Sequence, residues 1–81
     1  MVKVRERKLG REGADGLAYL GKNKIEIDPR LGPKERLFTL VHEGHHIAHD
    51  DDSEVAATKS EKIIGQILWD DGWRRVPKRF R

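Results

Sequence analysis

Apolar positions alternate with polar ones in the first third of the chain. Short alternating or apolar segments at residues 2–4, 17–20 and 24–28 predict β-strands. Residues 10–16 are rich in glycine and charged side chains, so we expect a loop there. The Gly-Lys-Asn sequence at 21–23 favours a turn that joins its two flanking segments in a β-hairpin.

Within the last of these segments, alternation predicts which side chains are covered. Ile25 and Ile27 are expected to face a core, because successive side chains of a strand point to opposite faces. Pro29 ends the segment, since proline has no N–H to donate to a neighbouring strand. The side chains expected to face solvent are Lys24, Glu26 and Asp28.

Helical spacing replaces alternation after residue 32. Pro33 is tolerated in a first helical turn, and apolar residues then recur three and four positions apart. Gly44 lies on this stripe and suggests close packing against another element. The stripe consists of Leu37, Leu40, Val41, Gly44, Ile47 and Ala48.

A second helix is expected from about residue 53 to residue 69. Asp51 and Glu54 have the spacing of a capping box at its start. Its predicted core side comprises Ala56, Ile63, Ile64, Ile67 and Leu68. Because the turn between the two helices is short, we expect them to run antiparallel.

These elements predict a single α+β domain over residues 1–81, with a small β-hairpin or three-stranded sheet packed on two antiparallel helices. A chain of 81 residues has a small core, so a bound metal or a partner is expected to contribute to its stability. Residues from about 74 onward are expected to form a basic, flexible tail.

The net charge of +3 is concentrated at the two ends of the chain. Such ends could contact nucleic acid, but no recognised nucleic-acid motif accompanies them, and solubilising termini are the favoured interpretation. The residues concerned are Lys3, Arg5, Arg7, Lys8, Arg11, Arg74, Arg75, Lys78, Arg79 and Arg81.

The chain contains no cysteine, so any zinc must be held by His, Asp or Glu. The first residues lack the apolar core of a signal peptide, and no apolar run approaches the length of a membrane span. We therefore expect a cytoplasmic protein with no membrane association. The sequence leaves its oligomeric state open.

The residues that carry candidate chemistry lie between positions 39 and 49. His42 and His46 are four residues apart, which places both imidazoles on one face of a helix, where they can ligate one Zn²⁺ ion. Glu43 follows the first histidine directly and can take a proton from a zinc-bound water, because the ion lowers the pKa of that water. This HExxH spacing is typical of zinc metallohydrolases, with Glu43 as the general base.

The third ligand is left open by the spacing. In an antiparallel pair of helices, the level of the two histidines falls opposite residues 55–59, and Glu54 and Glu61 flank that window. Glu54 is the favoured ligand and Glu61 the alternative. Three ligands along one helix converge poorly on a tetrahedral ion, so His49 is expected outside the first ligand set. The candidates for supporting or oxyanion contacts are His45, His49 and Tyr19.

Residues 24–75 resemble a family of short zinc metallopeptidases that phages often encode, and more distantly the gluzincins and the ImmA/IrrE-type metallopeptidase domain. The resemblance is carried by residues 25–46, by Ser53-Glu54-Val55 and by residues 68–74. It implies a minimal zincin core in which the two motif histidines and Glu54 hold zinc, and the cytosol of a host cell as the location. The short gap between His46 and Glu54 departs from the ImmA/IrrE-type pattern.

The sequence therefore predicts a zinc-dependent, metallopeptidase-like hydrolase that acts on a peptide or protein substrate. We expect a peptide to add as an extra strand at the sheet edge beside the motif helix, with its carbonyl at the metal. Two alternatives stay open: a zinc-stabilised binding module without turnover, and a basic phage protein that associates with nucleic acid.

Overall fold

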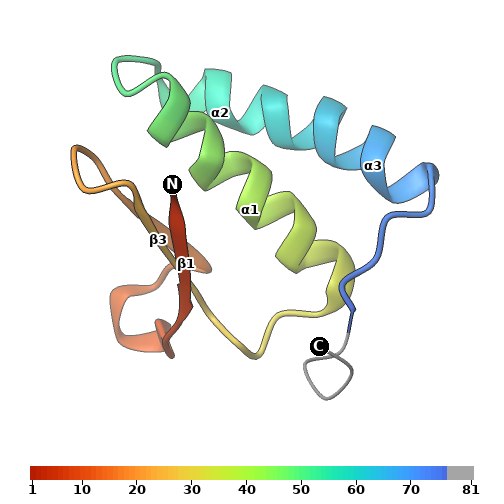
Figure 1. Cartoon of the computed structure of the whole chain (residues 1–81), viewed down its shortest axis with the longest axis horizontal. Helices are drawn as coiled ribbons and strands as arrows, with labels where there is room; N and C mark the ends of the chain where they lie inside the picture. Colours follow the sequence, from red (N-terminus) through yellow and green to blue (C-terminus); the bar gives the residue numbers. More distant parts are fainter. Residues whose placement is uncertain (77–81) are drawn as a thin grey trace.

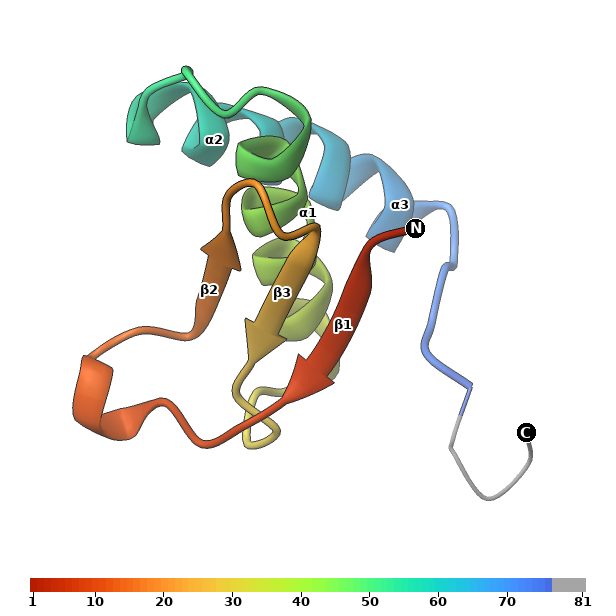
Figure 2. The same ribbon diagram turned by 60° about the vertical axis from the view of Figure 1, so that its left-hand side comes forward.

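Within residues 1–76, which the computed structural model describes, the strands form one three-stranded sheet in the order β1-β3-β2. The strands are β1 (Lys3–Glu6), β2 (Gly16–Tyr19) and β3 (Lys24–Ile27). β3 lies in the centre, parallel to β1 and antiparallel to β2 (Figure 2). The predicted hairpin is confirmed, and the loop before it contains a short 3₁₀ turn, η1 (Gly10–Glu12).

Helix α1 (Pro33–Ala48) forms the middle layer of the molecule, between the sheet and a second helix (Figure 1). The second helix is continuous in three parts: α2 (Glu54–Ser60), a π-helical turn η2 (Glu61–Gly65) and α3 (Gln66–Asp70). It contacts α1 along its length. The predicted α+β class, with a sheet packed on two helices, is confirmed.

The start of the second helix differs from the prediction. Ser53 is the N-cap, and its hydroxyl accepts a hydrogen bond from the backbone N–H of Ala56 at 3.2 Å. The expected capping box of Asp51 and Glu54 is therefore wrong. Ser53 satisfies one of the free N–H groups of the first turn, and this leaves the Glu54 side chain available for other contacts.

The side of the second helix that faces α1 also differs from the prediction. Ala57 and Gly65 are buried there, and a Cβ on Gly65 would lie 2.9 Å from Cδ1 of Phe38 in α1. Small residues let the two helices approach closely, and the three isoleucines turn outward, whereas the predicted core residues Ala56 and Leu68 are half-buried. The predicted core residues Ile63, Ile64 and Ile67 are instead 50%, 47% and 61% exposed.

Gly44 was expected to pack closely, but a Cβ added to it would meet no atom within 4 Å in the described residues. The stripe of α1 to which it belongs is half-buried from Leu37 to Ile47, and Ala48 is exposed. The close approach between the helices is therefore made by the glycine of the second helix.

The core lies around β3. The buried hydrophobic side chains among the described residues are Leu9, Ile25, Ile27 and Ala57. Ile25 and Ile27 are inward as predicted, but Glu26 and Asp28, predicted to face solvent, are only 7% and 5% exposed. Partners from outside this segment, such as Arg7 for Glu26 and Leu9 for Asp28, accompany their burial, and the alternation of apolar residues does not reveal them.

Both buried carboxylates have cationic partners. Asp28 accepts hydrogen bonds from the Arg30 guanidinium and from the backbone N–H groups of Leu9 and Arg30, and these hold its pKa well below the ordinary value. Glu26 accepts from the Arg7 guanidinium at 3.0 and 3.1 Å and from the Tyr19 hydroxyl, which lowers its pKa to about 2. These bonds tie the N-terminal segment to the centre of the sheet.

The chain after α3 returns towards β1. Arg74 stacks over the Trp69 ring at 3.3 Å, and Arg75 Nη1 lies 3.3 Å from Glu6 Oε2. The basic tail predicted from about residue 74 thus begins with two anchored arginines, and its other basic residues, at 78, 79 and 81, lie outside the described part. None of the helices in residues 1–76 combines the length and apolar character needed to cross a membrane.

Candidate metal centre

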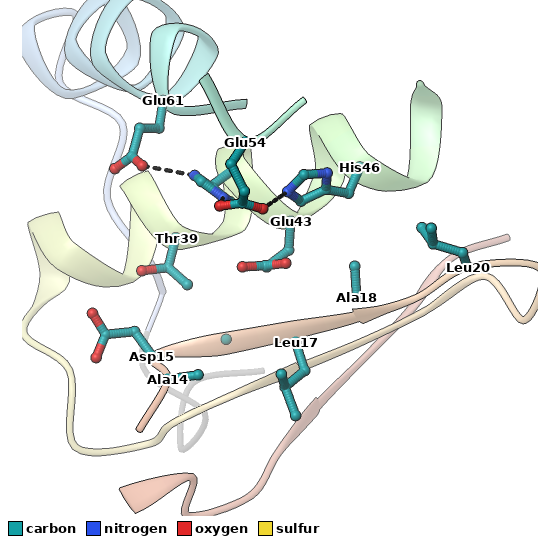
Figure 3. Close-up of a pocket in the computed structure, with 12 residues that line it drawn as sticks. Ala14, Asp15, Leu17, Ala18, Leu20, Thr39, Glu43, His46, Glu54 and Glu61 are labelled. Atoms are coloured by element: carbon teal, nitrogen blue, oxygen red, sulfur yellow. Dashed lines mark hydrogen bonds and ion pairs between the residues drawn. The ribbon is translucent and has the colours of Figure 1, made fainter. Parts of the chain in front are cut away.

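Three side chains from two helices converge beside the sheet (Figure 3). His42 and His46 project from one face of α1, and Glu54 is the first residue of α2. One ligand atom from each of the three lies within 4.8 Å of the others. The short loop after α1 is what brings Glu54 back to the level of the histidines.

The distances between the candidate ligand atoms bracket the spacing found around a single zinc ion. His46 Nε2 lies 2.5 Å from Glu54 Oε1, and His42 Nε2 lies 3.1 Å from Glu54 Oε2. Ligand atoms of a tetrahedral zinc site, each at about 2.0–2.2 Å from the ion, are about 3.3 Å apart. His46 Nε2 is also buried, and its close neighbour is the Glu54 carboxylate, although the contact lacks the angle of a regular hydrogen bond.

Glu61 takes a different position from Glu54. Its Oε1 lies 2.7 Å from Nδ1 of His42, on the side of the ring opposite Nε2. When Nδ1–H donates to Glu61, Nε2 carries the lone pair that faces Glu54 and His46. The two candidate glutamates are thereby distinguished: Glu54 lies in the ligand cluster, and Glu61 orients one of its histidines.

The charges of this cluster shift its pKa values in both directions. Burial alone would lower the pKa of His42, but the hydrogen bond to Glu61 and the charges of Glu43 and Glu54 outweigh it and raise that pKa. Burial alone would raise the pKa of Glu54, yet the contacts with His46 and His42 together outweigh it and lower that pKa.

Glu43 lies on the α1 face that turns towards β2 (Figure 3). Its burial raises the pKa of its carboxyl group, against the opposing effect of His42 and His46. A carboxylate whose pKa is raised towards neutrality is a better proton acceptor at physiological pH. The position beside both motif histidines is the one that a general base for a metal-bound water requires.

A cleft of about 540 Å³ contains these groups. One wall comes from the two helices, and the other from the segment around β2. Gly16 makes the approach of this strand possible, because a Cβ there would lie 2.7 Å from Thr39 Cγ2 and 3.1 Å from Glu43 Cγ. The β2 wall is formed by Ala14, Asp15, Gly16, Leu17, Ala18 and Leu20.

The sequence prediction missed this β2 wall. The sequence predicts a loop over residues 10–16, but Gly16 is the first residue of β2. A glycine gives no local sign that it faces a helix 27 positions away, at Glu43. Thr39 likewise carries no motif signal. The position of Gly16 could have been inferred only by placing the hairpin on α1 in three dimensions.

The three candidate supporting residues do not line this cleft. His45 Nε2 lies 2.9 Å from Asp52 Oδ2, and its Nδ1 lies 2.7 Å from Ser60 Oγ, so His45 ties the interhelical loop to the second helix. His49 is exposed at the end of α1, and its ring is 5.0 Å from that of His45. Tyr19 donates its hydroxyl hydrogen to Glu26.

The chain matches no protein-family model, no curated protein and no solved structure. The resemblance to short phage metallopeptidases therefore stays a prediction from the sequence. The case for a metal centre depends on the geometry of the residues themselves.

Proposed function

We propose that this chain is a zinc-dependent, peptidase-like hydrolase. The observation that carries the proposal is the convergence of His42, His46 and Glu54 with Glu43 beside them. Two neutral imidazoles and a carboxylate form a donor set that suits Zn²⁺ and leaves a coordination position for a water, as catalytic zinc sites do.

A zinc ion held by His42, His46 and Glu54 would polarise the carbonyl of a peptide and lower the pKa of a nearby water. Glu43 would accept the proton of that water and then donate it to the nitrogen of the leaving amine. Glu61 keeps His42 oriented throughout, since its hydrogen bond fixes which ring nitrogen bears hydrogen.

The free edge of β2 supports a peptide as the substrate class. Asp28 donates its N–H to the Asp15 carbonyl, so by the alternation of antiparallel pairs Leu17 and Tyr19 also bond to β3. The N–H and C=O groups of Gly16 and Ala18 then point to the open edge. An extended peptide paired with them would run along the cleft, past Glu43.

The proposal is tested by measuring zinc content and hydrolysis of a dye-labelled unfolded protein. Purified wild type should hold one zinc per chain and cleave the labelled protein. Glu43→Gln should keep the zinc and lose activity by about 10²- to 10⁴-fold, because it removes the proton acceptor and no ligand. Absence of zinc in the wild type after reconstitution would refute the proposal.

Matched variants of the two remaining glutamates sharpen the result. Glu54→Gln should abolish stoichiometric zinc binding, whereas Glu61→Gln should weaken the affinity for zinc by about 10- to 100-fold through the orientation of His42. Two results together would favour a zinc-stabilised binding module. The wild type would hold zinc without hydrolysing the labelled protein, and Glu43→Gln would have the same zinc content as the wild type.

A further inference from the structure

The outer face of the second helix carries large apolar side chains that the described part of the molecule leaves exposed. Val55 is 78% exposed, and Ile63, Ile64 and Ile67 are between 47% and 61% exposed. Both views show this helix as the outermost layer, on the far side of α1 from the sheet (Figures 1 and 2). Clustered apolar side chains on a surface commonly mark an interaction site.

Four residues define the centre of this face, which we call the outer row: Lys59, Ile63, Ile67 and Asp71. They follow one another at intervals of four and all are exposed. The π turn η2 lies in the middle of the row. In an α-helix, residues four apart shift gradually around the helix axis. A π turn contains more residues than an α turn and offsets this shift, so the four residues stay on one face.

The order of the outer row is self-complementary. Reversed, it reads Asp71, Ile67, Ile63, Lys59, so an antiparallel second copy would place isoleucine against isoleucine and lysine against aspartate at both ends. A two-fold interface uses the same patch on both subunits and needs this kind of pattern. We propose that two copies of the chain associate antiparallel through the outer row, about a two-fold axis that passes between Ile63 and Ile67.

The charges at the ends of the row are available for this contact. Lys59 and Lys62 are exposed, and neither forms an ion pair with any residue in 1–76. Asp70 accepts from the Gln66 amide and Asp71 from the Trp73 indole, so neither has a cationic partner within that range. Both lie at the C-terminal end of a helix, where the helix dipole disfavours negative charge.

The small core is a second reason to expect association. Among the described residues, the hydrophobic side chains that are buried number four, and none of them belongs to the row. Pairing two outer rows would cover Ile63 and Ile67 in both copies. The interface is limited to one helix face, so it belongs to the small, weak class, and the dimer should dissociate on dilution.

The metal centre does not enter this inference. The cleft is lined by β2, α1, Glu54 and Glu61, and no residue of the outer row contributes to it. Dimerisation and zinc binding can therefore be measured and can fail separately.

Charge exchange tests the proposal most directly, with sedimentation velocity over a concentration series as the measurement. Variant one is Lys59→Glu with Lys62→Glu, and variant two is Asp70→Lys with Asp71→Lys. Each variant alone faces itself with like charges, so its dissociation constant should rise at least tenfold above that of the wild type. An equimolar mixture restores opposite charges at both ends and should recover dimer at near wild-type concentrations.

Ile63→Ser with Ile67→Ser supplies the complementary variant. It should weaken the dimer and should not be rescued by mixing with either charge variant, because the apolar centre is lost on one side. Circular dichroism on every variant confirms that the helices are retained. The proposal is overturned if the wild type stays monomeric at concentrations of about 100 μM and above, where a weak dimer should form. A dimer that neither charge variant weakens also overturns it, because the interface then lies elsewhere.

Discussion

The sheet side of the molecule contains side chains that are almost fully buried, whereas the buried residues of the second helix are an alanine and a glycine. Leu9 and Ile27 are 0% exposed and Ile25 is 4% exposed, while Val55, Ile63, Ile64 and Ile67 of the second helix are exposed. On the sheet side, burial of large side chains and of two paired carboxylates holds the chain together. On the helix side, the close approach at Gly65 sets the distance between α1 and the second helix.

This difference explains where candidate chemistry can be placed. A tight helix pair with small contact residues fixes Glu54 and Glu61 at the level of His42 and His46. The stability needed for that arrangement comes from the other side of α1. The sheet therefore acts as the scaffold, and the helix pair holds the polar groups in place.

The largest expected effect on stability is at the centre of the sheet. Ile27→Ala should lower the free energy of unfolding by about 2–5 kcal/mol, because it leaves a cavity in a core with few members. Ile63→Ala removes the same atoms from a half-exposed position and should cost the monomer about 0.5 kcal/mol. Urea unfolding at low protein concentration measures both.

Equal losses in the two variants would contradict the comparison, since the second helix would then contribute to the core as much as β3 does. The low concentration matters because dimerisation through Ile63 would otherwise add its own stabilisation. Ile25→Val is a milder control on the sheet side and should cost about 0.5–1.5 kcal/mol.

The sequence predicted the order and class of the elements because hydrophobic period is a local property. Alternation at Ile25 and Ile27 and the HExxH motif on a helix were both visible in single segments. The antiparallel helix pair also followed from a short loop, and with it the two glutamates that flank the histidines.

What the sequence could not supply depends on contacts between distant segments. The outward rotation of Ile63, Ile64 and Ile67 follows from the approach of Phe38 to Gly65, which no window of the second helix contains. The burial of Glu26 and Asp28 depends on Arg7, Leu9 and Arg30, and the wall of the cleft depends on Gly16. In each case, contacts with residues far along the chain determine whether a side chain is buried or exposed, and the local sequence pattern predicts otherwise.

A pair of glycine variants tests the helix side with a smaller expected effect. Gly65→Ala places a Cβ 2.9 Å from the Phe38 ring and should destabilise the protein by about 1–3 kcal/mol, less the gain in helix propensity. Gly44→Ala meets no neighbour within 4 Å and should stabilise α1 by about 1 kcal/mol. Thermal unfolding of both variants gives opposite shifts.

If Gly65→Ala were as stable as Gly44→Ala, the close approach of the helices would not be a constraint. The same variants carry a readout at the candidate centre. Displacing the second helix moves Glu54 relative to the histidines, so Gly65→Ala should also weaken zinc binding, whereas Gly44→Ala should leave it unchanged.

The smallest effect expected is a pH dependence that belongs to the sheet side. The Arg7 guanidinium, with the Tyr19 hydroxyl, lowers the pKa of Glu26 to about 2 from an ordinary value of 4.5. Because the folded-state pKa is depressed, the stabilisation is complete above about pH 4.5 and is lost as pH falls from there towards 2. Asp28 contributes in the same direction, since its pKa is lowered too. The free energy of unfolding of the metal-free protein should therefore decrease with acidification below that pH.

Glu26→Gln isolates the contribution of this carboxylate. The variant should be less stable than wild type near pH 6, and the difference should shrink as pH falls below about 4.5, because the wild-type carboxylate then loses its charge. Asp50→Asn removes an exposed acidic residue of the interhelical loop, and its stability relative to wild type should not change over the same range. The titration of His42 lies outside this pH range. Because its pKa is raised, the stabilisation that it contributes is complete below its ordinary pKa of 6.5 and is lost at higher pH. A Glu26→Gln difference that stayed constant down to pH 2.5 would show that the ion pair with Arg7 does not stabilise the sheet, and that shape alone accounts for the burial of Glu26.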